Sequence, residues 1–288
     1  FKAAEQKIEA LDLRLNNVTR LASLDVIATV PPDASGAIAQ DLRVVASKKN
    51  ILVYSTDSVY LFDPIKRELK PLSGIAGKIP SISCAVAASD TVFYFCSGDG
   101  NRLYSLTLPD QTVKSISFPR NDQESSLDAV QIYSNRLYVL TRNQGHIYRH
   151  LSVATGFSRG VAWTRSPQDT LKSAASFTVD GKVYALGNDG TIHLYSSGVA
   201  EDRPTSETVK NTLVHATLLW TDADDSLLYA LDPSEKKLIA VNKKTFDLAA
   251  QIVSDQFTNL QGFAVNRSKN ELFLLDAGRI IRVPFDVK

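Results

Sequence analysis

Short runs of alternating apolar and polar residues, separated by turn residues, cover most of this chain of 288 residues. In residues 181–198, two such runs flank Asn188-Asp189-Gly190, a sequence typical of a tight hairpin turn. The pattern recurs at six aromatic residues that each follow an apolar one, here called the aromatic anchors: Tyr54, Tyr94, Tyr138, Tyr184, Tyr229 and Phe273. Successive anchors are 40, 44, 46, 45 and 44 residues apart. A repeat of about 45 residues built from short strands indicates the blades of a β-propeller.

Each anchor also has a similar context. A run of small and apolar residues precedes it, an aliphatic or aromatic run follows it, and most units contain a fourth run. One such four-stranded meander cannot bury both of its faces, whereas six meanders arranged radially bury each face against a neighbour. The sequence therefore predicts an all-β fold, a six-bladed β-propeller of four-stranded antiparallel blades, preceded by a short N-terminal α-helix.

The sixth unit has only three strands before the sequence reaches residue 288. Residues 24–31 predict a strand that precedes the first blade. We expect this strand to complete the last blade by pairing with residues 279–285, because such a closure removes the exposed edges of the sheets. The propeller domain would then cover residues 24–288.

Residues 1–23 predict an amphipathic helix. Apolar residues follow one another at spacings of three and four, which is the pattern of a heptad seam: Phe1, Ala4, Ile8, Leu11, Leu15, Val18 and Ala22. Two interpretations are open. The helix packs its apolar stripe against the propeller, or it is the end of a coiled-coil stalk that continues upstream of Phe1 and mediates self-association.

Composition narrows the classes of function. The net charge of +1 argues against a nucleic-acid partner, which would favour a basic protein. No run approaches the eighteen or so apolar residues of a membrane span, so contact with a membrane would come only through a segment upstream of residue 1. Motifs of serine hydrolases, zinc proteases and phosphate-binding loops are absent from the sequence. We therefore predict no catalytic residues, no metal site and no cofactor.

Cys84 and Cys96 fall in the first and second strands of one predicted blade. An odd-length turn would place them opposite each other, so they form either a disulfide or two buried thiols. The acidic clusters at residues 121–125 and 222–226 lack the ligand spacing of a calcium loop and predict solvated loops. The four histidines, His146, His150, His193 and His215, predict structural roles, although His215 opens a first strand.

Topology selects the face of the propeller that would bind a ligand. The loops that enter each first strand surround one mouth of the central channel. Their predicted channel-mouth residues are Asp41, Ser83, Asp128, Lys172, His215 and Gln261. A propeller lactonase would gather several carboxylate and amide ligands around a metal ion here, and this mixed set matches that requirement only thinly.

The strands of residues 137–140 and 183–186, the hairpin of residues 180–198 and the unit at residues 227–244 resemble the NHL/TolB-like group of propellers. Residues 127–288 resemble more closely the extracytoplasmic propellers of membrane-anchored proteins from Chloroflexi and candidate-phyla bacteria. This resemblance implies an extracytoplasmic binding module, anchored to the cell membrane, that presents its loop-rich face to a protein, peptide or glycan partner. The alternative is a propeller hydrolase or lactonase with a metal site at the channel mouth.

Overall fold

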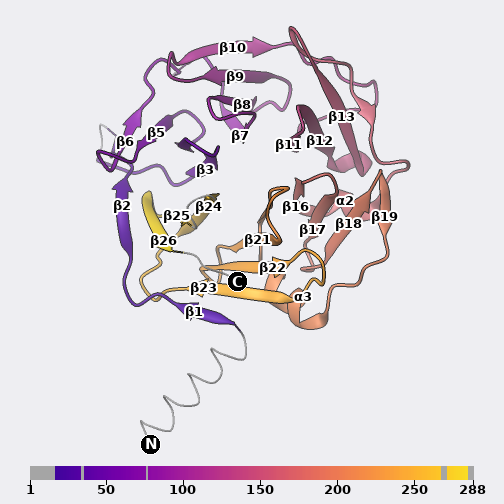
Figure 1. Ribbon diagram of the computed structural model, residues 1–288. Coiled ribbons are helices and arrows are strands. Elements are labelled where there is room, and N and C mark those ends of the chain that lie inside the picture. The colour runs from indigo at the N-terminus through magenta and orange to yellow at the C-terminus, as the bar shows by residue number, and fades with distance from the viewer. Residues whose placement is uncertain (1–16, 34–35, 76, 267–270, 285–288) are drawn as a thin grey trace, which may run out of the picture.

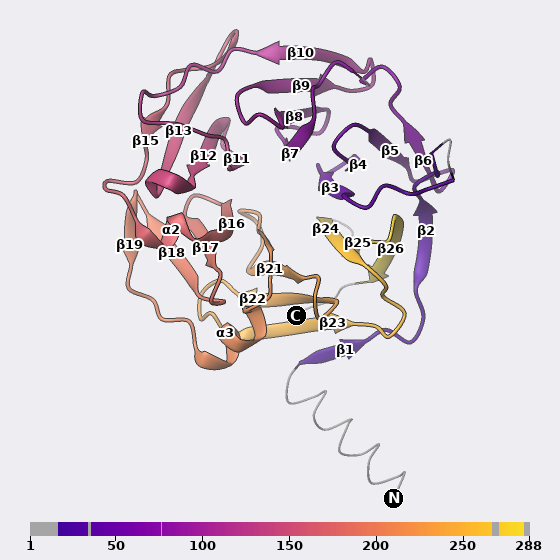
Figure 2. The same ribbon diagram turned by 180° about the vertical axis from the view of Figure 1, so that it is seen from behind.

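Six small β-sheets surround a central axis, and each sheet lies beside two others (Figure 1). The computed structural model describes residues 17–33, 36–75, 77–266 and 271–284. Seen from behind, the sheets form the same closed ring (Figure 2). This arrangement is a six-bladed β-propeller of mainly four-stranded antiparallel sheets, which confirms the fold predicted from the repeat.

The first three blades follow one another along the chain, and the strands within each blade are in sequence order from the axis outward. Blade 1 contains β3 (Arg43–Ala46), β4 (Ile51–Tyr54), β5 (Val59–Asp63) and β6 (Glu68–Pro71). Blade 2 contains β7 (Ile82–Ala87), β8 (Val92–Ser97), β9 (Leu103–Thr107) and β10 (Thr112–Ile116). Blade 3 contains β11 (Ala129–Tyr133), β12 (Arg136–Thr141), β13 (His146–Val153), β14 (Gly156–Phe157) and β15 (Val161–Ala162).

The last three blades include two strands from the N-terminal segment. Blade 4 contains β16 (Ala174–Val179), β17 (Val183–Gly187), β18 (Ile192–Ser196) and β19 (Val199–Glu201). Blade 5 contains β20 (Leu218–Trp220), β21 (Leu227–Asp232), β22 (Lys237–Asn242), β23 (Leu248–Val253) and β1 (Val18–Arg20). Blade 6 contains β24 (Leu260–Asn266), β25 (Glu271–Asp276), β26 (Arg279–Pro284) and β2 (Asp25–Thr29).

Short helices interrupt the connections around blades 3 and 4. The 3₁₀ helix η1 (Arg142–Gln144) follows β12, α2 (Asp169–Lys172) precedes blade 4, and α3 (Glu207–Leu213) precedes blade 5. The side chain of Ser206 caps α3 by accepting a hydrogen bond from the Val209 backbone amide. Val209 and Leu213, four residues apart, are both buried and anchor this helix between blades 4 and 5.

The hydrophobic core is divided among the six interfaces between neighbouring blades. All six aromatic anchors lie in the second strand of their blade, as the repeat predicts. Each anchor contacts another aromatic side chain with ring centroids 5.4–6.4 Å apart: Tyr54–Phe95, Tyr94–Phe157, Tyr138–Trp163, Tyr184–Phe246, Tyr229–Phe263 and Phe273–Phe62. The repeated aromatic is therefore the side chain that joins successive blades.

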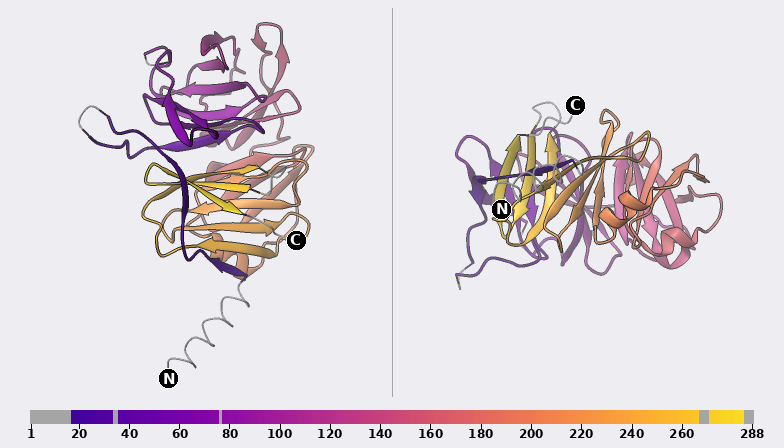
Figure 3. Two further views of the ribbon diagram at one scale, coloured as in Figure 1. Left: turned by 60° about the vertical axis from the view of Figure 1, so that its left-hand side comes forward. Right: turned by 90° about the horizontal axis from the view of Figure 1, so that it is seen from below.

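The N-terminal segment closes the propeller ring. Strand β2 pairs antiparallel with β26, with Asp25 opposite Arg282, which is the pairing expected from the incomplete sixth unit. An ion pair between Arg282 Nη2 and Asp25 Oδ2, 2.7 Å apart, joins the same two strands. Figure 3 shows the segment passing from the edge of one blade to the next along the outside of the ring.

The prediction of a helix over residues 1–23 is wrong at its C-terminal end. Val18–Arg20 forms β1, which pairs in parallel with β23 and adds a fifth strand to blade 5. Leu21 packs against the core between blades 5 and 6, and its backbone amide donates to Val253 O at 2.8 Å. Pairing with a sheet edge satisfies backbone groups on both strands and outweighs the weak helical periodicity of this stretch. Residues 1–16, which carry most of the predicted seam, lie outside the described residues.

Candidate functional site

The first strands of the blades lie nearest the axis and form the wall of the channel (Figure 2). Five of the predicted channel-mouth residues lie within two residues of the start of these strands, and the fifth of them, Lys172, is described below with His215. Asp41 lies two residues before β3 and Asp128 lies one residue before β11, while Ser83 and Gln261 are the second residues of β7 and β24. Both aspartates are exposed, whereas Ser83 and Gln261 are half-buried.

Asp41 stabilises the turn between β4 and β5. Its Oδ2 atom accepts hydrogen bonds from the Thr56 hydroxyl and from the Thr56 backbone amide, the latter at 2.8 Å. The hydroxyl bond is the main cause that holds the pKa of Asp41 below its ordinary value. The carboxylate therefore stays ionised to a lower pH than an ordinary aspartate does.

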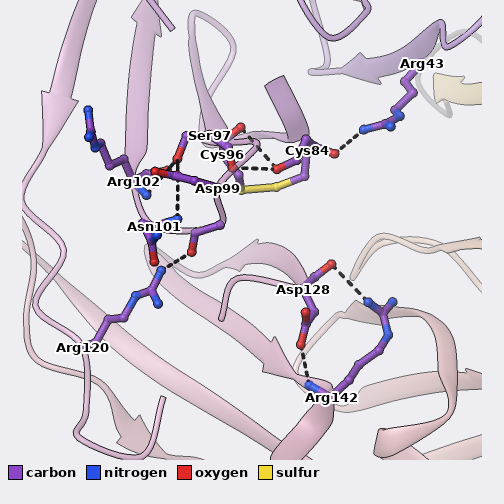
Figure 4. Close-up of a disulfide and its surroundings, with 12 residues drawn as sticks. Arg43, Cys84, Cys96, Ser97, Asp99, Asn101, Arg102, Arg120, Asp128 and Arg142 are labelled. Atoms are coloured by element: carbon purple, nitrogen blue, oxygen red, sulfur yellow. Dashed lines mark hydrogen bonds between the residues drawn. A yellow bond between two sulfur atoms is a disulfide. The ribbon is translucent and has the colours of Figure 1, made fainter. Parts of the chain in front are cut away.

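Asp128 is held in the same way by blade 3, as Figure 4 shows. Its Oδ2 atom accepts a hydrogen bond from the Arg142 backbone amide at 2.6 Å, and its backbone oxygen accepts one from the Arg142 guanidinium at 3.3 Å. The same guanidinium donates to the backbone oxygens of Ala174 and Ala175 in blade 4, at 2.8 and 3.1 Å. Arg142 therefore ties the first strands of blades 3 and 4 together at the mouth.

Ser83 and Gln261 also take part in links between neighbouring blades. The backbone oxygen of Ser83 accepts a hydrogen bond from the Arg43 guanidinium of blade 1. The Gln261 amide donates to Gln40 O at 2.8 Å, which joins blade 6 to the segment that enters blade 1. Polar groups along the channel mouth, from the backbone at Ser83 and from the side chain at Gln261, thus link neighbouring blades.

Lys172 and His215 precede their first strands by two and three residues, since β16 begins at Ala174 and β20 at Leu218. Lys172 is the last residue of α2, where its Nζ atom lies 2.8 Å from Asp169 Oδ1, and His215 lies in the exposed turn between α3 and β20. Helices α2 and α3 occupy the connections into blades 4 and 5, which is why neither residue lies within a first strand. The missed signals were the Ser206 cap and the apolar pair of Val209 and Leu213 in α3.

No hydrogen bond or ion pair among the described residues links any two of the six predicted channel-mouth residues. Within the same part of the chain, no three His, Cys, Asp or Glu side chains gather in an arrangement that would hold a metal ion. The structure brings the residues to one face of the propeller, and it does not bring their functional groups together.

Cys84 and Cys96 form a disulfide between the first and second strands of blade 2 (Figure 4). They are opposite each other in the β7–β8 pairing, with a register shift between Ile82 and Cys84. Of the two alternatives left open by the sequence, the structure has the disulfide. It links the wall of the channel to the second strand.

Both acidic clusters differ from the prediction of solvated loops, because each contains one buried carboxylate. Glu124 is 3% exposed and pairs with His150, and Asp225 is 4% exposed and accepts a hydrogen bond from the Tyr229 hydroxyl at 3.0 Å. Such groups are buried because they have partners. His150 is 26 residues from Glu124 in the sequence, and Tyr229 is 4 residues from Asp225. Only the second pair is therefore close enough to be visible in a local sequence pattern.

A shallow hollow of about 420 Å³, lined mainly by residues with polar side chains, lies on the mouth face between α2 and the turn from β17 to β18. Asp169, Ser173, Asn188, Asp189 and His193 contribute to its lining. A backbone hydrogen bond from Thr191 holds the pKa of Asp189 below its ordinary value, and burial lowers the pKa of His193. These residues were not predicted, because the Asn-Asp-Gly sequence was interpreted only as a turn.

Solved structures with the same fold include proteins of different function. A streptogramin B lyase matches at 12% identity and a TM-score of 0.53, over 84% of this chain and 92% of that chain. Virginiamycin B lyase from Staphylococcus aureus matches at 12% identity and a TM-score of 0.51, over 86% and 85%. A nidogen/laminin complex matches at 11% identity and a TM-score of 0.58, over 77% and 82%. No protein-family model matches the sequence, and no curated protein does so. At these identities the likeness shows the fold alone.

Proposed function

We propose that this propeller is a non-catalytic binding module that presents its mouth face to a protein, peptide or glycan partner. The proposal rests on one observation, which is that the polar groups at the channel mouth already form hydrogen bonds within a blade or between blades. Asp41 and Asp128 cap turns of their own blades, and Gln261 bridges to the next blade. Catalysis needs a reactive group and its base or metal within hydrogen-bond reach of each other.

The loops of the mouth face form a hollow with polar side chains in its lining, which a partner could contact. The hollow beside α2 lies among loops that are fastened to rigid strands, an arrangement that places binding residues precisely. Gly190, at the end of the β17–β18 turn, packs so closely on α3 that an added Cβ atom would lie 2.2 Å from Lys210 O. The turn that borders the hollow is therefore held by the neighbouring helix.

The fold itself favours neither an enzyme nor a binding module, since one fold supports many functions. Similar structures include lyases and a nidogen propeller solved in complex with laminin. The proposal consequently relies on the mouth residues of this chain. Because the resemblance to NHL/TolB-like propellers points the same way, we retain that resemblance as part of the proposal.

The experiment compares two charge-altering variants that lie on opposite faces. Asn188→Arg changes an exposed residue at the hollow, and Lys244→Glu changes an exposed residue in the β22–β23 turn. Immobilised wild type and Lys244→Glu should retain the same component from a detergent-solubilised envelope fraction, and Asn188→Arg should lose it. Lactone hydrolysis that is abolished by chelation, or by Asp41→Asn with Asp128→Asn, would contradict the proposal in favour of a metal-dependent hydrolase.

We also propose an extracytoplasmic location. The disulfide of Cys84 and Cys96 supports it, because disulfides persist in oxidising compartments. Among the described residues, no helix has both the length and the apolar character needed to cross a membrane. Attachment to a membrane would come from a segment upstream of residue 1, as in the membrane-anchored propellers that the sequence resembles. Fractionation of the native cells tests this proposal.

The N-terminal seam supports a stalk that mediates self-association. Leu11 and Leu15 belong to this seam and lie outside the described residues. Light scattering should show an oligomer that Leu11→Glu and Leu15→Glu convert to a monomer. A wild-type chain that is strictly monomeric would contradict the stalk and leave the binding module unaffected.

A further inference from the structure

A second cavity, of about 310 Å³, lies at the opposite end of the propeller from the channel mouth. It opens between blade 6 and blade 1, beside the β3–β4 and β5–β6 turns of blade 1. Its inner wall consists of Ile27, Phe62, Ala264 and Phe273, which are each less than 10% exposed. We call it the seam cavity, because the N-terminal strand β2 closes the propeller ring at this interface.

The strand register explains why the space is empty at this interface. The first-strand residue opposite each anchor points to the same side of its blade as the anchor. In blade order these residues are Arg43, Val86, Gln131, Thr178, Trp220 and Ala264. Alanine, the smallest of the six, occurs only in blade 6. The volume that a larger side chain would fill at Ala264 therefore remains empty at the interface between blade 6 and blade 1.

The anchor of blade 6 also lacks a polar tip. In blade 5 the Tyr229 hydroxyl donates to Asp225, four residues earlier, and in blade 4 the Tyr184 hydroxyl is next to Asp180, also four residues earlier. Phe273 has no hydroxyl, and its ring lies 6.4 Å from that of Phe62. The seam cavity thus keeps an apolar, partly aromatic wall where blades 4 and 5 place a hydrogen-bonded tyrosine.

The rim of the seam cavity is basic. Lys48, Lys49, Arg67 and Arg282 contribute to its lining, against one acid, Glu271. Arg282 is neutralised by Asp25 at 2.7 Å, and the lysines face acids outside the cavity, Asp224 at 4.0 Å and Asp90 at 3.2 Å. Both lysine side chains are 75% exposed, so these pairs are weak. Arg67 has no ion-pair partner in the described part of the chain.

We propose that the seam cavity binds a small organic anion with an apolar, aromatic or branched body. The apolar body would occupy the space beside Ala264 and Phe273, and the anionic group would lie at the rim near Lys49 and Arg67. The volume is at the lower end of the roughly 300–1,000 Å³ that small-molecule pockets occupy. This site is separate from the mouth face and does not depend on the proposed function of that face.

The probe is 8-anilinonaphthalene-1-sulfonate, which combines an aromatic body with one negative charge. Its fluorescence on titration with the native protein should report one site per chain. Ala264→Val copies the residue that blade 2 has at the equivalent position and should weaken binding at least tenfold by filling the cavity. Val86→Ile adds one carbon at the same position of blade 2 and should leave the affinity unchanged. Thermal melts of both variants identify any loss of folding.

A second pair of measurements tests the charge. The double variant Lys49→Gln with Arg67→Gln should weaken binding of the sulfonate and leave binding of its neutral counterpart, N-phenyl-1-naphthylamine, unchanged. Both substitutions are at exposed positions, so folding should be preserved. The proposal is overturned if the folded wild type binds no sulfonate probe, or if folded Ala264→Val binds it as wild type does. Equal weakening of both probes by the rim variant overturns the preference for an anion.

Discussion

The Nε2 atom of His150 lies 3.0 Å from Oε1 of Glu124, and both side chains are completely buried. The other ring nitrogen, Nδ1, lies 2.9 Å from Ser158 O and donates to it, because a carbonyl oxygen only accepts. Glu124 Oε2 accepts a hydrogen bond from the Asn121 backbone amide at 3.1 Å. The pair thus fastens the loop that enters blade 3 to its third strand, β13.

We predict that Glu124→Ala lowers the free energy of unfolding by about 3–5 kcal/mol, because it leaves buried polar groups without a partner. Glu124→Gln should retain most of the stability, since an amide can donate to Nε2 of a neutral His150 and accept from Asn121. Asp122→Ala in the same loop is the control, because its ion pair with Arg159 is exposed. Urea unfolding measures all three, and equal stability of Glu124→Ala and Asp122→Ala would contradict this account.

This pair also shows what the sequence did not reveal. Glu124 belongs to a short polar run between two strands, and nothing within that run distinguishes it from the exposed Asp122. Its burial depends on His150 and on Gly160, where an added Cβ atom would lie 2.5 Å from Glu124 Oε2. Such long-range partners are invisible to local patterns.

The fold was predictable because its signal is repeated and local. Each anchor lies in a short, almost continuously apolar strand that is buried between blades, and six copies at near-constant spacing outweigh irregularities in any one blade. The channel-mouth prediction depended instead on loop length. It put Ser83 and Gln261 within first strands, and it put the strand start two residues early at Lys172 and three residues early at His215, because helices α2 and α3 occupy those connections.

The N-terminal segment supplies the next prediction. A chain that starts at residue 17 keeps β1 and β2 and should unfold at the same temperature as the full chain. A chain that starts at residue 32 loses Ile27 and Val30 from the core and exposes the edge of β26. Each large apolar side chain contributes about 1.5–3 kcal/mol when fully buried, so this chain should aggregate or melt well below the other.

An intermediate chain that starts at residue 24 separates the two strands. It lacks β1, which adds to an already four-stranded blade 5, and should lose less stability than the chain that starts at residue 32. Melting and size-exclusion measurements on the three chains rank them. A monomeric, fully stable chain that starts at residue 32 would show that β2 does not close the propeller ring.

The disulfide in blade 2 gives a stability prediction. Cys84 and Cys96 are 12 residues apart in sequence. Cross-linking a loop of about that length restricts the unfolded chain by roughly 3 kcal/mol in the entropic model. Replacing both cysteines by alanine should therefore lower the free energy of unfolding by about 2–3 kcal/mol.

Dithiothreitol should have the same effect on the wild type and none on the double variant, which serves as the control. Thiol titration of the denatured, unreduced protein should detect no free thiol. Two reactive thiols in a protein purified without reductant would contradict the disulfide and weaken the argument for an oxidising compartment.

Two histidines predict how stability depends on pH. Burial lowers the pKa of His193 and of His146 from the ordinary value of 6.5, although the Asp189 carboxylate opposes the change at His193. A lowered native pKa means that the unfolded chain takes up a proton at a higher pH than the folded protein does. Stability is therefore fully present above about pH 6.5 and declines as the pH falls through the lowered native values.

His193→Gln should reduce this decline, because the glutamine does not titrate in either state, and combination with His146→Gln should reduce it further. His215→Gln is the matched control, since His215 is exposed in a turn and meets similar solvent in both states. Urea unfolding of the four proteins between pH 7.5 and pH 5, a range of roughly one to two units on either side of an unperturbed histidine, measures the slopes. Stability should decline most steeply in the wild type and in His215→Gln, because both proteins retain His146 and His193. In the unfolded state these two rings bind protons that they exclude when buried in the folded protein. A slope in His193→Gln as steep as that of the wild type would show that burial of this ring does not govern the acid sensitivity of the propeller.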